Sequence, residues 1–157
     1  MRIGILTLSD TRTPANDESG KALRALVEAL PGGEVVAYHL VADDQRCIES
    51  ELIRFVDDLQ CQVVLTTGGT GLGPRDVTPE ATTAVCDRLV PGIAEAMRAR
   101  SMAETPMAML SRAVAGMRGA CLIVNLPGSP KGAVTCAEVV LPVLGHALWV
   151  AAGQPAH

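Results

Sequence analysis

The feature that most constrains this chain is a glycine-rich loop placed between a short apolar run and a strong helix-start signal. Residues 63–65 (VVL) form the apolar run, and their pattern predicts a buried strand. Four glycines follow within six positions, at 68, 69, 71 and 73, and Thr67 and Thr70 flank the glycine pair. Residues 78–80 (TPE) then predict a helix with an N-cap threonine and proline at its first position. Strand, glycine loop and helix together present backbone N–H groups to an anion.

A tight turn that closes a strand onto a helix is the alternative interpretation of this loop, but one glycine pair would serve that purpose. Four glycines and two hydroxyl residues therefore favour the binding of a phosphate or another anion. The loop has neither the lysine of a Walker A motif nor the spacing of GxGxxG. A P-loop nucleoside triphosphatase and a dinucleotide oxidoreductase are therefore disfavoured.

Apolar patterning along the rest of the chain alternates between strands and helices. Buried strands are predicted at residues 2–8, 35–40 and 121–125, besides the strand before the glycine loop, which extends over residues 62–66. Helices are predicted at residues 23–30, 44–59, from 79 onward, 93–102 and 134–148, the last kinked near Pro142. Residues 113–120 predict an edge strand that turns into the last buried strand, and residues 103–112 are ambiguous.

This alternation predicts an α/β fold in a single domain covering residues 1–157. We expect an open, mostly parallel sheet with helices on both faces, in three αβα layers, and a small antiparallel edge element. Ligands of such sheets bind beyond the carboxyl ends of the strands. That rule brings together four loops, at residues 9–20, 41–45, 66–78 and 125–131, and all four carry small, polar or charged residues.

Composition limits the classes of partner. The net charge of -4, the scattered basic residues and an aromatic content of only 2% argue against nucleic-acid binding. The five cysteines show no metal-ligand or CxxC spacing, which predicts reduced, buried thiols in a cytoplasmic protein. No signal peptide is recognisable, and the last apolar stretch, residues 139–152, is too short to span a bilayer, so no membrane partner is expected.

Aspartates in two of these loops suggest a metal site. Asp76 lies inside the glycine loop, where a turn at the helix start explains it as well as catalysis does. Asp43 and Asp44 precede a predicted helix, so one of them is expected to be its N-cap. Two carboxylates beside an anion site would repel a phosphate unless a divalent cation joined them. Mg²⁺ is commonly held by one or two carboxylates together with substrate phosphates, so the combination favours metal-assisted nucleotide chemistry.

Other residues of these loops are candidates for substrate contact, although turn or helix capping explains several of them equally well. They are Ser9, Asp10, Asp17, Ser19, Asn125, Pro127, Gly128 and Ser129. Lys131 opposes the dipole of the helix that it begins, so we expect it to face an anion, with a solvated lysine as the alternative. Arg75 and Arg112 are further candidates for pairing with phosphate charge.

The chain resembles the MoaB/Mog family of molybdenum cofactor biosynthesis. The resemblance rests on residues 66–71 (TTGGTG) followed by residues 75–80 (RDVTPE). Supporting matches are residues 8–11 (LSDT), 17–20 (DESG), 108–112 (AMLSR) and 125–130 (NLPGSP). The similarity covers essentially the whole chain, in order. The related MoeA and CinA proteins share the TGG core but usually lack the RDVTP continuation.

The resemblance implies a molybdopterin-binding domain with molybdopterin adenylyltransferase activity. In that reaction the terminal phosphate of molybdopterin attacks the α-phosphate of ATP, with Mg²⁺ required, and gives adenylyl-molybdopterin and pyrophosphate. The resemblance implies that Asp43 and Asp76 are the catalytic pair, which would also hold Mg²⁺. It further implies a homotrimer or homohexamer, and it allows a MoeA-type molybdenum insertase as a partner.

The residues expected to bind the substrates, molybdopterin and ATP, combine the four loops. They are Ser9, Asp10, Thr67, Gly68, Gly69, Thr70, Gly71, Arg75, Ser111, Arg112, Asn125, Pro127, Gly128, Ser129 and Lys131. Two other functions stay open, namely a non-catalytic molybdopterin-binding protein and a nucleotide hydrolase of the CinA type. Methionines at 97, 102, 107, 109 and 117 would suit either a core or an interface, and the resemblance favours an interface.

Overall fold

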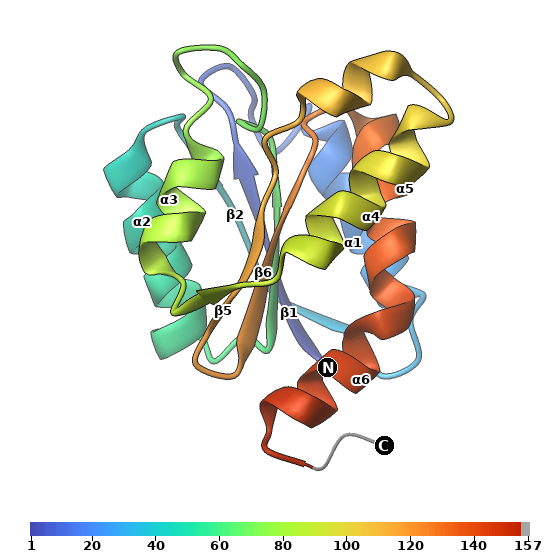
Figure 1. The fold of residues 1–157 in the computed structure, drawn as a ribbon. Coiled ribbons are helices and arrows are strands. Elements are labelled where there is room, and N and C mark those ends of the chain that lie inside the picture. The colour runs from blue at the N-terminus through green and yellow to red at the C-terminus, as the bar shows by residue number, and fades with distance from the viewer. Residues whose placement is uncertain (155–157) are drawn as a thin grey trace.

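A six-stranded sheet runs through the molecule between two layers of helices (Figure 1). The computed structural model describes residues 1–154, so the last three residues of the predicted domain lie outside the described residues. The sheet order is β2-β1-β3-β6-β5-β4. Its strands are β1 (Arg2–Leu8), β2 (Glu34–Val41), β3 (Val63–Thr67), β4 (Arg88–Leu89), β5 (Ala115–Arg118) and β6 (Cys121–Leu126). The first four strands of that order are parallel, and β5 and β4 pair antiparallel.

Helices cover both faces of the sheet, which confirms the predicted fold class. One face carries α1 (Glu18–Glu28), α4 (Pro91–Met102) and α5 (Pro130–Val140), whereas α2 (Gln45–Ile53) and α3 (Thr78–Val85) cover the other (Figure 1). A final helix, α6 (Leu144–Ala151), follows α5 after a short 3-10 turn at Leu141–Val143. This break lies at the proline where the sequence predicts a kink.

Two hydrophobic clusters, one on each face of the sheet, hold the layers together. Along β1, Ile3 and Ile5 face the α1, α4 and α5 layer, while Leu6 and Leu8 face the α2 and α3 layer. Strands that are buried on both faces explain the nearly continuous apolar runs in the sequence. At Gly4 an added Cβ would lie 2.5 Å from the ring of Phe55, the one phenylalanine of the chain.

Several local predictions differ from the structure at the edges of elements. The edge of the sheet on the antiparallel side is the two-residue strand β4, not the predicted strand near residues 113–120, which is β5 and lies one position inward. The ambiguous residues 103–112 contain a 3-10 helix, Pro106–Leu110. The helix α2 continues into a π-helical turn, Arg54–Asp58, and so reaches nearly to the predicted end. The edge position of β4 depends on its pairing with β5, which local patterns do not encode.

The predicted N-cap of α3 is wrong. The helix begins at Thr78 itself and has no side-chain cap. The Thr78 hydroxyl instead donates to the carbonyl oxygen of Gly68 at 3.0 Å. A residue that was expected to cap a helix therefore holds the glycine loop in place.

The C-terminal helical stretch is longer than predicted. Within residues 1–154, Pro130–Ala151 is one stretch of 22 residues that is long and apolar enough to cross a membrane by length and composition alone. The prediction that no apolar stretch here is long enough to span a bilayer is therefore wrong, because the helical stretch also includes residues 130–138. Core helices pass the same test, and α5 contributes Ala133, Ala137 and Val140 to the core cluster beside α1 and α4.

The cysteines only partly follow the prediction of buried thiols. All five are free, and Cys61, Cys121 and Cys136 are buried, but Cys86 is half-buried and Cys47 is exposed. Cys47 lies in the first turn of α2, on the solvent side of the helix.

Candidate active site

The four polar loops meet where the strand order of the sheet reverses. The chain leaves β1 through α1 on one face to reach β2, and leaves β2 through α2 on the other face to reach β3, so β1 has a neighbour on each side. Figure 1 shows the loops after β1 and β3 together at one end of the sheet. Such a switch point is where open α/β sheets bind ligands.

The glycine loop has a backbone path that only glycine allows. Gly68 and Gly69 have φ angles of +107° and +65°. An added Cβ at Gly68 would lie 2.3 Å from the carbonyl oxygen of Leu8, at the end of the neighbouring strand β1. The loop is closed by a hydrogen bond from Thr78 N to Gly69 O at 3.1 Å. Gly68 thus lets the loop lie directly against the end of β1, and a tight turn alone would not require that contact.

Asp43 lies at the end of β2 and faces this loop. Its backbone N donates to Asp10 Oδ1, and Asp10 N donates to Asp43 Oδ2, both at 3.1 Å. Among the residues that the structure describes, Asp43 Oδ1 is the one buried side-chain oxygen or nitrogen without a hydrogen-bond partner. Burial, together with the nearby carboxylates of Asp10 and Asp76, raises the pKa of Asp43. A buried acceptor with no donor is costly, so this oxygen suits a ligand.

Asp44, the adjacent acid, has the capping role. Its carboxylate accepts from Cys47 N at 2.9 Å, and it is the N-cap of α2. This hydrogen bond is the main reason that the pKa of Asp44 is lowered. The expectation that one of the two neighbouring acids caps the helix is therefore confirmed, and it falls on Asp44.

Asp76 lies across the glycine loop from Asp43. Its Oδ2 accepts from Gly73 N at 2.8 Å, so the alternative of a hydrogen bond to the start of α3 at Thr78 does not occur. Added Cβ atoms at Gly71 and Gly73 would each lie 2.8 Å from this carboxylate, and one at Gly69 would lie 3.2 Å from Asp43 Oδ1. The missing side chains of the loop therefore leave room for both acids.

This donor set fits a Mg²⁺ ion, and the nearby Arg75 only partly offsets the charge of Asp43, whose pKa stays raised. Two acids from different strand ends lie near each other, and one has an oxygen without a hydrogen-bond donor. Among residues 1–154 no group of three His, Cys, Asp or Glu side chains could hold a metal. A magnesium site here would therefore use Asp43 and Asp76 with oxygens of the substrate, as is usual for this ion.

Two arginines predicted to meet phosphate are paired with acids of the protein. Arg75 binds Asp10 through Nε at 3.0 Å and Nη2 at 2.9 Å, and these bonds lower the pKa of Asp10. Arg112 contacts carbonyl groups of the glycine loop and the carboxylate of Glu80. Neither guanidinium is therefore a free cation in this structure.

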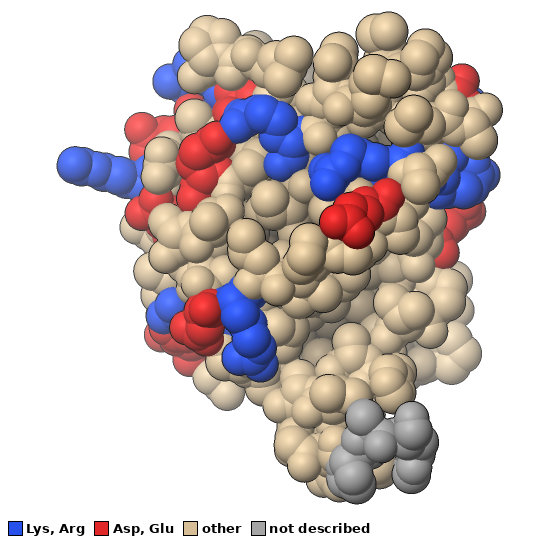
Figure 2. All heavy atoms as spheres, in the orientation of Figure 1, with Lys and Arg blue, Asp and Glu red and all other residues tan. Residues whose placement is uncertain are grey.

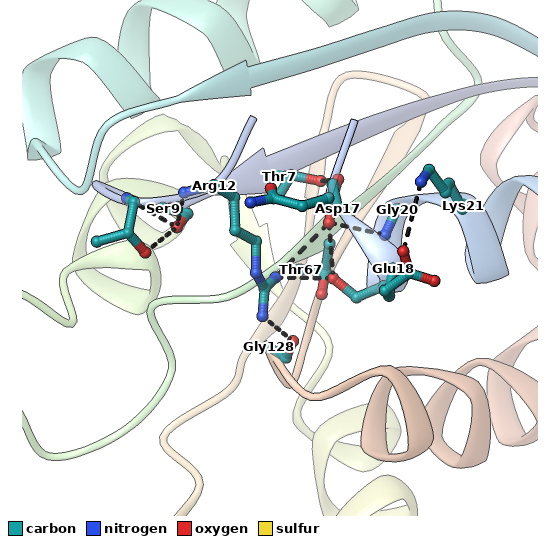
Figure 3. A network of polar contacts seen from close by, with 12 residues as sticks. Thr7, Ser9, Arg12, Asp17, Glu18, Gly20, Lys21, Thr67 and Gly128 are labelled. Carbon is teal, nitrogen blue, oxygen red and sulfur yellow. Dashed lines mark hydrogen bonds and ion pairs between the residues drawn. The ribbon is translucent and has the colours of Figure 1, made fainter. Parts of the chain in front are cut away.

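The sequence analysis missed Arg12, which links two loops of the site (Figure 3). Its Nη2 donates to Gly128 O at 2.7 Å, and its Nη1 donates to Ser19 Oγ at 2.9 Å and lies 3.6 Å from Asp17 Oδ1. A lone arginine in a polar loop carries no pattern that would have marked it. The fold is needed to bring residue 128 beside it.

Asp17 anchors this network from a buried position. Its carboxylate accepts from Thr7 Oγ1 and Tyr38 Oη, each at 2.6 Å, and from Gly20 N at 3.1 Å at the start of α1. Burial favours the protonated form, but the hydrogen bonds outweigh it and lower the pKa of Asp17. The capping explanation of Asp17 is therefore confirmed.

The end of β6 and the loop that follows it are held mainly by bonds within the protein. The buried amide of Asn125 donates to Thr66 Oγ1 at 3.0 Å and Thr82 Oγ1 at 2.8 Å. Thr67 Oγ1 donates to Pro127 O at 2.7 Å. Ser129 is the N-cap of α5 and accepts from Gly132 N at 3.2 Å. These bonds fix the turn at the edge of the site, whatever ligand it meets.

Three further predicted residues lie at the rim of this region. Ser9 Oγ accepts from the backbone N of Thr11 and Arg12, and Ser111 Oγ accepts from Ala113 N at 3.3 Å. Lys131 is 82% exposed and pairs with Glu104 at 3.0 Å, so the anion that it faces here belongs to the protein. Figure 2 shows basic and acidic side chains lying beside one another on this part of the surface.

Comparison with known proteins identifies the family. Residues 4–146 match the family described as "Probable molybdopterin binding domain". The chain is 44% identical over 149 residues to a molybdopterin adenylyltransferase of Helicobacter pylori (strain 26695), covering 93% of this chain and 85% of that one. It is 40% identical over 147 residues to the molybdenum cofactor synthesis protein cinnamon of Drosophila melanogaster, covering 92% of this chain but 24% of that protein.

A solved structure agrees in both sequence and shape. The molybdopterin biosynthesis enzyme MoaB of Thermus thermophilus is 51% identical, superposes with a TM-score of 0.88, and covers 98% of both chains. The sheet and helices that position the glycine loop thus have the fold of a known type of domain. This chain belongs to the MoaB/Mog family of molybdopterin-binding domains of molybdenum cofactor biosynthesis.

Proposed function

We propose that this protein is a molybdopterin adenylyltransferase that uses ATP and Mg²⁺. An oxygen of the terminal phosphate of molybdopterin forms a bond to the α-phosphorus of ATP. The bond from that phosphorus to the β-phosphate oxygen breaks, and pyrophosphate leaves. The family match and the relatives named molybdopterin adenylyltransferase support this reaction.

The observation that carries the proposal is the unpartnered oxygen of Asp43. An acid whose pKa is raised by burial and by two neighbouring carboxylates destabilises the folded site while it stays ionised. A divalent cation would remove that cost. Its binding would also explain why Asp43 and Asp76 lie together beside a glycine loop suited to an anion.

The chemistry of the site matches the needs of this reaction. A phosphate nucleophile is already ionised at neutral pH, so no general base is required, and no Ser–His pair lies in the described loops. Two anions must instead be brought together and aligned. When bound, Mg²⁺ would supply charge neutralisation. We expect the glycine-loop N–H groups to orient one phosphate, and the loop at residues 125–131, next to the start of α5, to hold the second substrate.

The wider setting of the enzyme is part of the same proposal. We expect a homotrimer or homohexamer that works in the cytoplasm, and a MoeA-type molybdenum insertase is a reasonable recipient of the product. Among the described residues, large exposed apolar side chains near the site at Met102, Met107, Met109 and Leu110 support contact with another protein surface.

The test is mass-spectrometric detection of adenylyl-molybdopterin from purified protein, molybdopterin, ATP and Mg²⁺. Asp76→Asn should keep the fold and lower turnover by roughly two orders of magnitude or more, because a principal electrostatic element is lost. Asp57→Asn, which breaks an ion pair with Arg118 at the far end of the sheet, is the matched control. Release of AMP or pyrophosphate without molybdopterin would instead identify a hydrolase, and molybdopterin binding without product would identify a non-catalytic binding protein.

A further inference from the structure

Arg112 contacts the glycine loop at three points, two at its start and one at Asp76. Its backbone N donates to Thr70 O at 2.9 Å, its Nε donates to Gly71 O at 2.7 Å, and its Nη2 donates to Asp76 O. One residue therefore holds both ends of the segment that carries Asp76. Three carbonyl oxygens of this segment accept hydrogen bonds from Arg112 and so are not left to face an anionic substrate.

The charge of Arg112 is matched by Glu80 in the first turn of α3. Arg112 Nη1 pairs with Glu80 Oε1, and Nη2 lies 3.4 Å from Glu80 Oε2. The hydrogen bond from Arg112 lowers the pKa of Glu80. A guanidinium has five N–H donors, and carbonyl groups and Glu80 already engage all three of its nitrogens. This arrangement leaves little capacity for a phosphate contact.

The glycine loop needs such an external support. Glycine has more conformational freedom than any other residue, and this loop has four glycines between Thr67 and Pro74. Within the loop, Asp76 accepts a hydrogen bond from Gly73 N, so its orientation depends on the path of these glycines. A loop that must hold an anion and a metal-binding acid at fixed positions works best when it is ordered before the substrate binds.

We infer that Arg112, with Glu80 as its counter-charge, is a positioning residue that fixes the glycine loop and Asp76 for catalysis and makes no contact with substrate phosphate. The inference rests on the proposed adenylyl transfer and assigns to Arg112 a role different from the phosphate contact expected from sequence. The planar fork of arginine is essential to this role, because it reaches two carbonyl groups and a carboxylate at once.

Steady-state kinetics of Arg112→Lys and Arg112→Gln test the inference. A positioning role predicts that both variants lose about tenfold or more in kcat while the KM values for ATP and molybdopterin change less than about threefold, since substrate contacts remain. Glu80→Gln should give a smaller loss in the same direction. Adding it to Arg112→Gln should lower kcat little further, because both changes break the same unit.

The matched control is Arg118→Gln. Arg118 makes the same kinds of bond at the opposite end of the sheet, to Val85 O at 3.1 Å and to both carboxylate oxygens of Asp57. This variant should lose a similar amount of stability and keep wild-type kinetics. A loss of activity in Arg112→Gln that the control shares would mean that general destabilisation is responsible, which would overturn the inference.

Hydrogen exchange of the full-length protein supplies a readout that does not depend on activity. Arg112→Gln should speed exchange in residues 68–77 and leave the core strands β1 and β3 unchanged. Unchanged exchange in this segment would overturn the inference, as would Arg112→Lys with wild-type kcat and a raised KM for ATP, which indicates a direct phosphate contact. A wild-type protein that forms no adenylyl-molybdopterin would reject the proposed function, while the exchange result would still decide the role of Arg112.

Discussion

Neighbouring residues with the same side chain have different roles at the end of β2. The carboxylate of Asp44 accepts a hydrogen bond from the first turn of α2. One carboxylate oxygen of Asp43, beside the glycine loop, has no hydrogen-bond donor. Sequence reasoning could expect one cap and one functional acid here, but only the fold shows which oxygen stays unpaired. Its position depends on the reciprocal hydrogen bonds with Asp10, 33 residues away.

The two acids should therefore respond in opposite ways to substitution. Asp43→Ala is expected to lower adenylylation by roughly two orders of magnitude, as the loss of a principal charged group does. Because its raised pKa marks a carboxylate that is unfavourable in the folded protein, Asp43→Asn should not lower the melting temperature. Asp44→Ala should lower the melting temperature and keep most of the activity, since a helix cap is lost. Turnover and thermal melts of each variant decide the assignment, and the reverse pattern would exchange the two roles.

Asp17 predicts a pH dependence of stability. Its pKa is lowered in the folded state, so its stabilising effect is complete above the unfolded value of about 3.9 and is lost as the pH falls through the folded value. Asp17→Asn removes this titration. The difference in urea midpoint between wild type and Asp17→Asn should be large at pH 7 and should shrink below about pH 4. A difference that stays constant from about pH 7 to about pH 3 would contradict the assignment.

At the scale of elements, the glycine loop works because β1 and α3 enclose it. Gly68 meets the end of β1, and the Thr78 hydroxyl at the start of α3 meets Gly68 O. The sequence shows that this loop is unusual and where it lies. It does not show that Thr78 holds the loop or that Arg112 supports it, because both depend on contacts between segments distant along the chain.

Gly68→Ala should therefore abolish activity and destabilise the fold. Its φ of +107° is strained for alanine, and the new methyl group would lie 2.3 Å from a backbone carbonyl that cannot easily move. Gly92→Ala is a suitable control, because no atom lies within 4 Å of its added Cβ and its φ is not positive. Thermal melts should show an unchanged or raised midpoint for the control and a lowered one for Gly68→Ala. Equal midpoints would show that the loop relaxes around the methyl group.

The predicted elements that matched best were those set by burial, such as the four parallel strands and the helices that cover them. Those that differed were set by pairing, such as the two-residue strand β4, whose residues are both exposed and carry no apolar pattern. The candidate site shows the same division. Asp76 and the glycines follow from the chemistry of a single loop, and the choice of Asp43 over Asp44 comes from the family resemblance. Arg12 acquires its place in the site only when residues 12 and 128 come together.

For the whole molecule, the methionine-rich region predicts assembly. Met97 and Met117 lie in the core, but Met102, Met107 and Met109 are exposed, and no residue of the 3-10 helix Pro106–Leu110 is buried. The family resemblance implies a trimer or a dimer of trimers, so light scattering should show one of these at micromolar concentration, with the exposed methionines as the candidate interface. Met107→Glu and Met109→Glu together should shift the protein toward the monomer if this patch is the interface. A wild-type monomer would refute the prediction.

Both ends of the described chain lie far from the reactive end of the sheet. Met1 precedes β1, whose seven residues place it roughly 20 Å from the loop that β1 enters, and α6 projects from the same distant end (Figure 1). Another domain, a fluorescent reporter or an immobilising support joined at either end of the described residues should therefore leave the proposed substrate site uncovered. This geometry suits the domain for use as a module, and in the Drosophila relative the matching region is about a quarter of a much longer polypeptide.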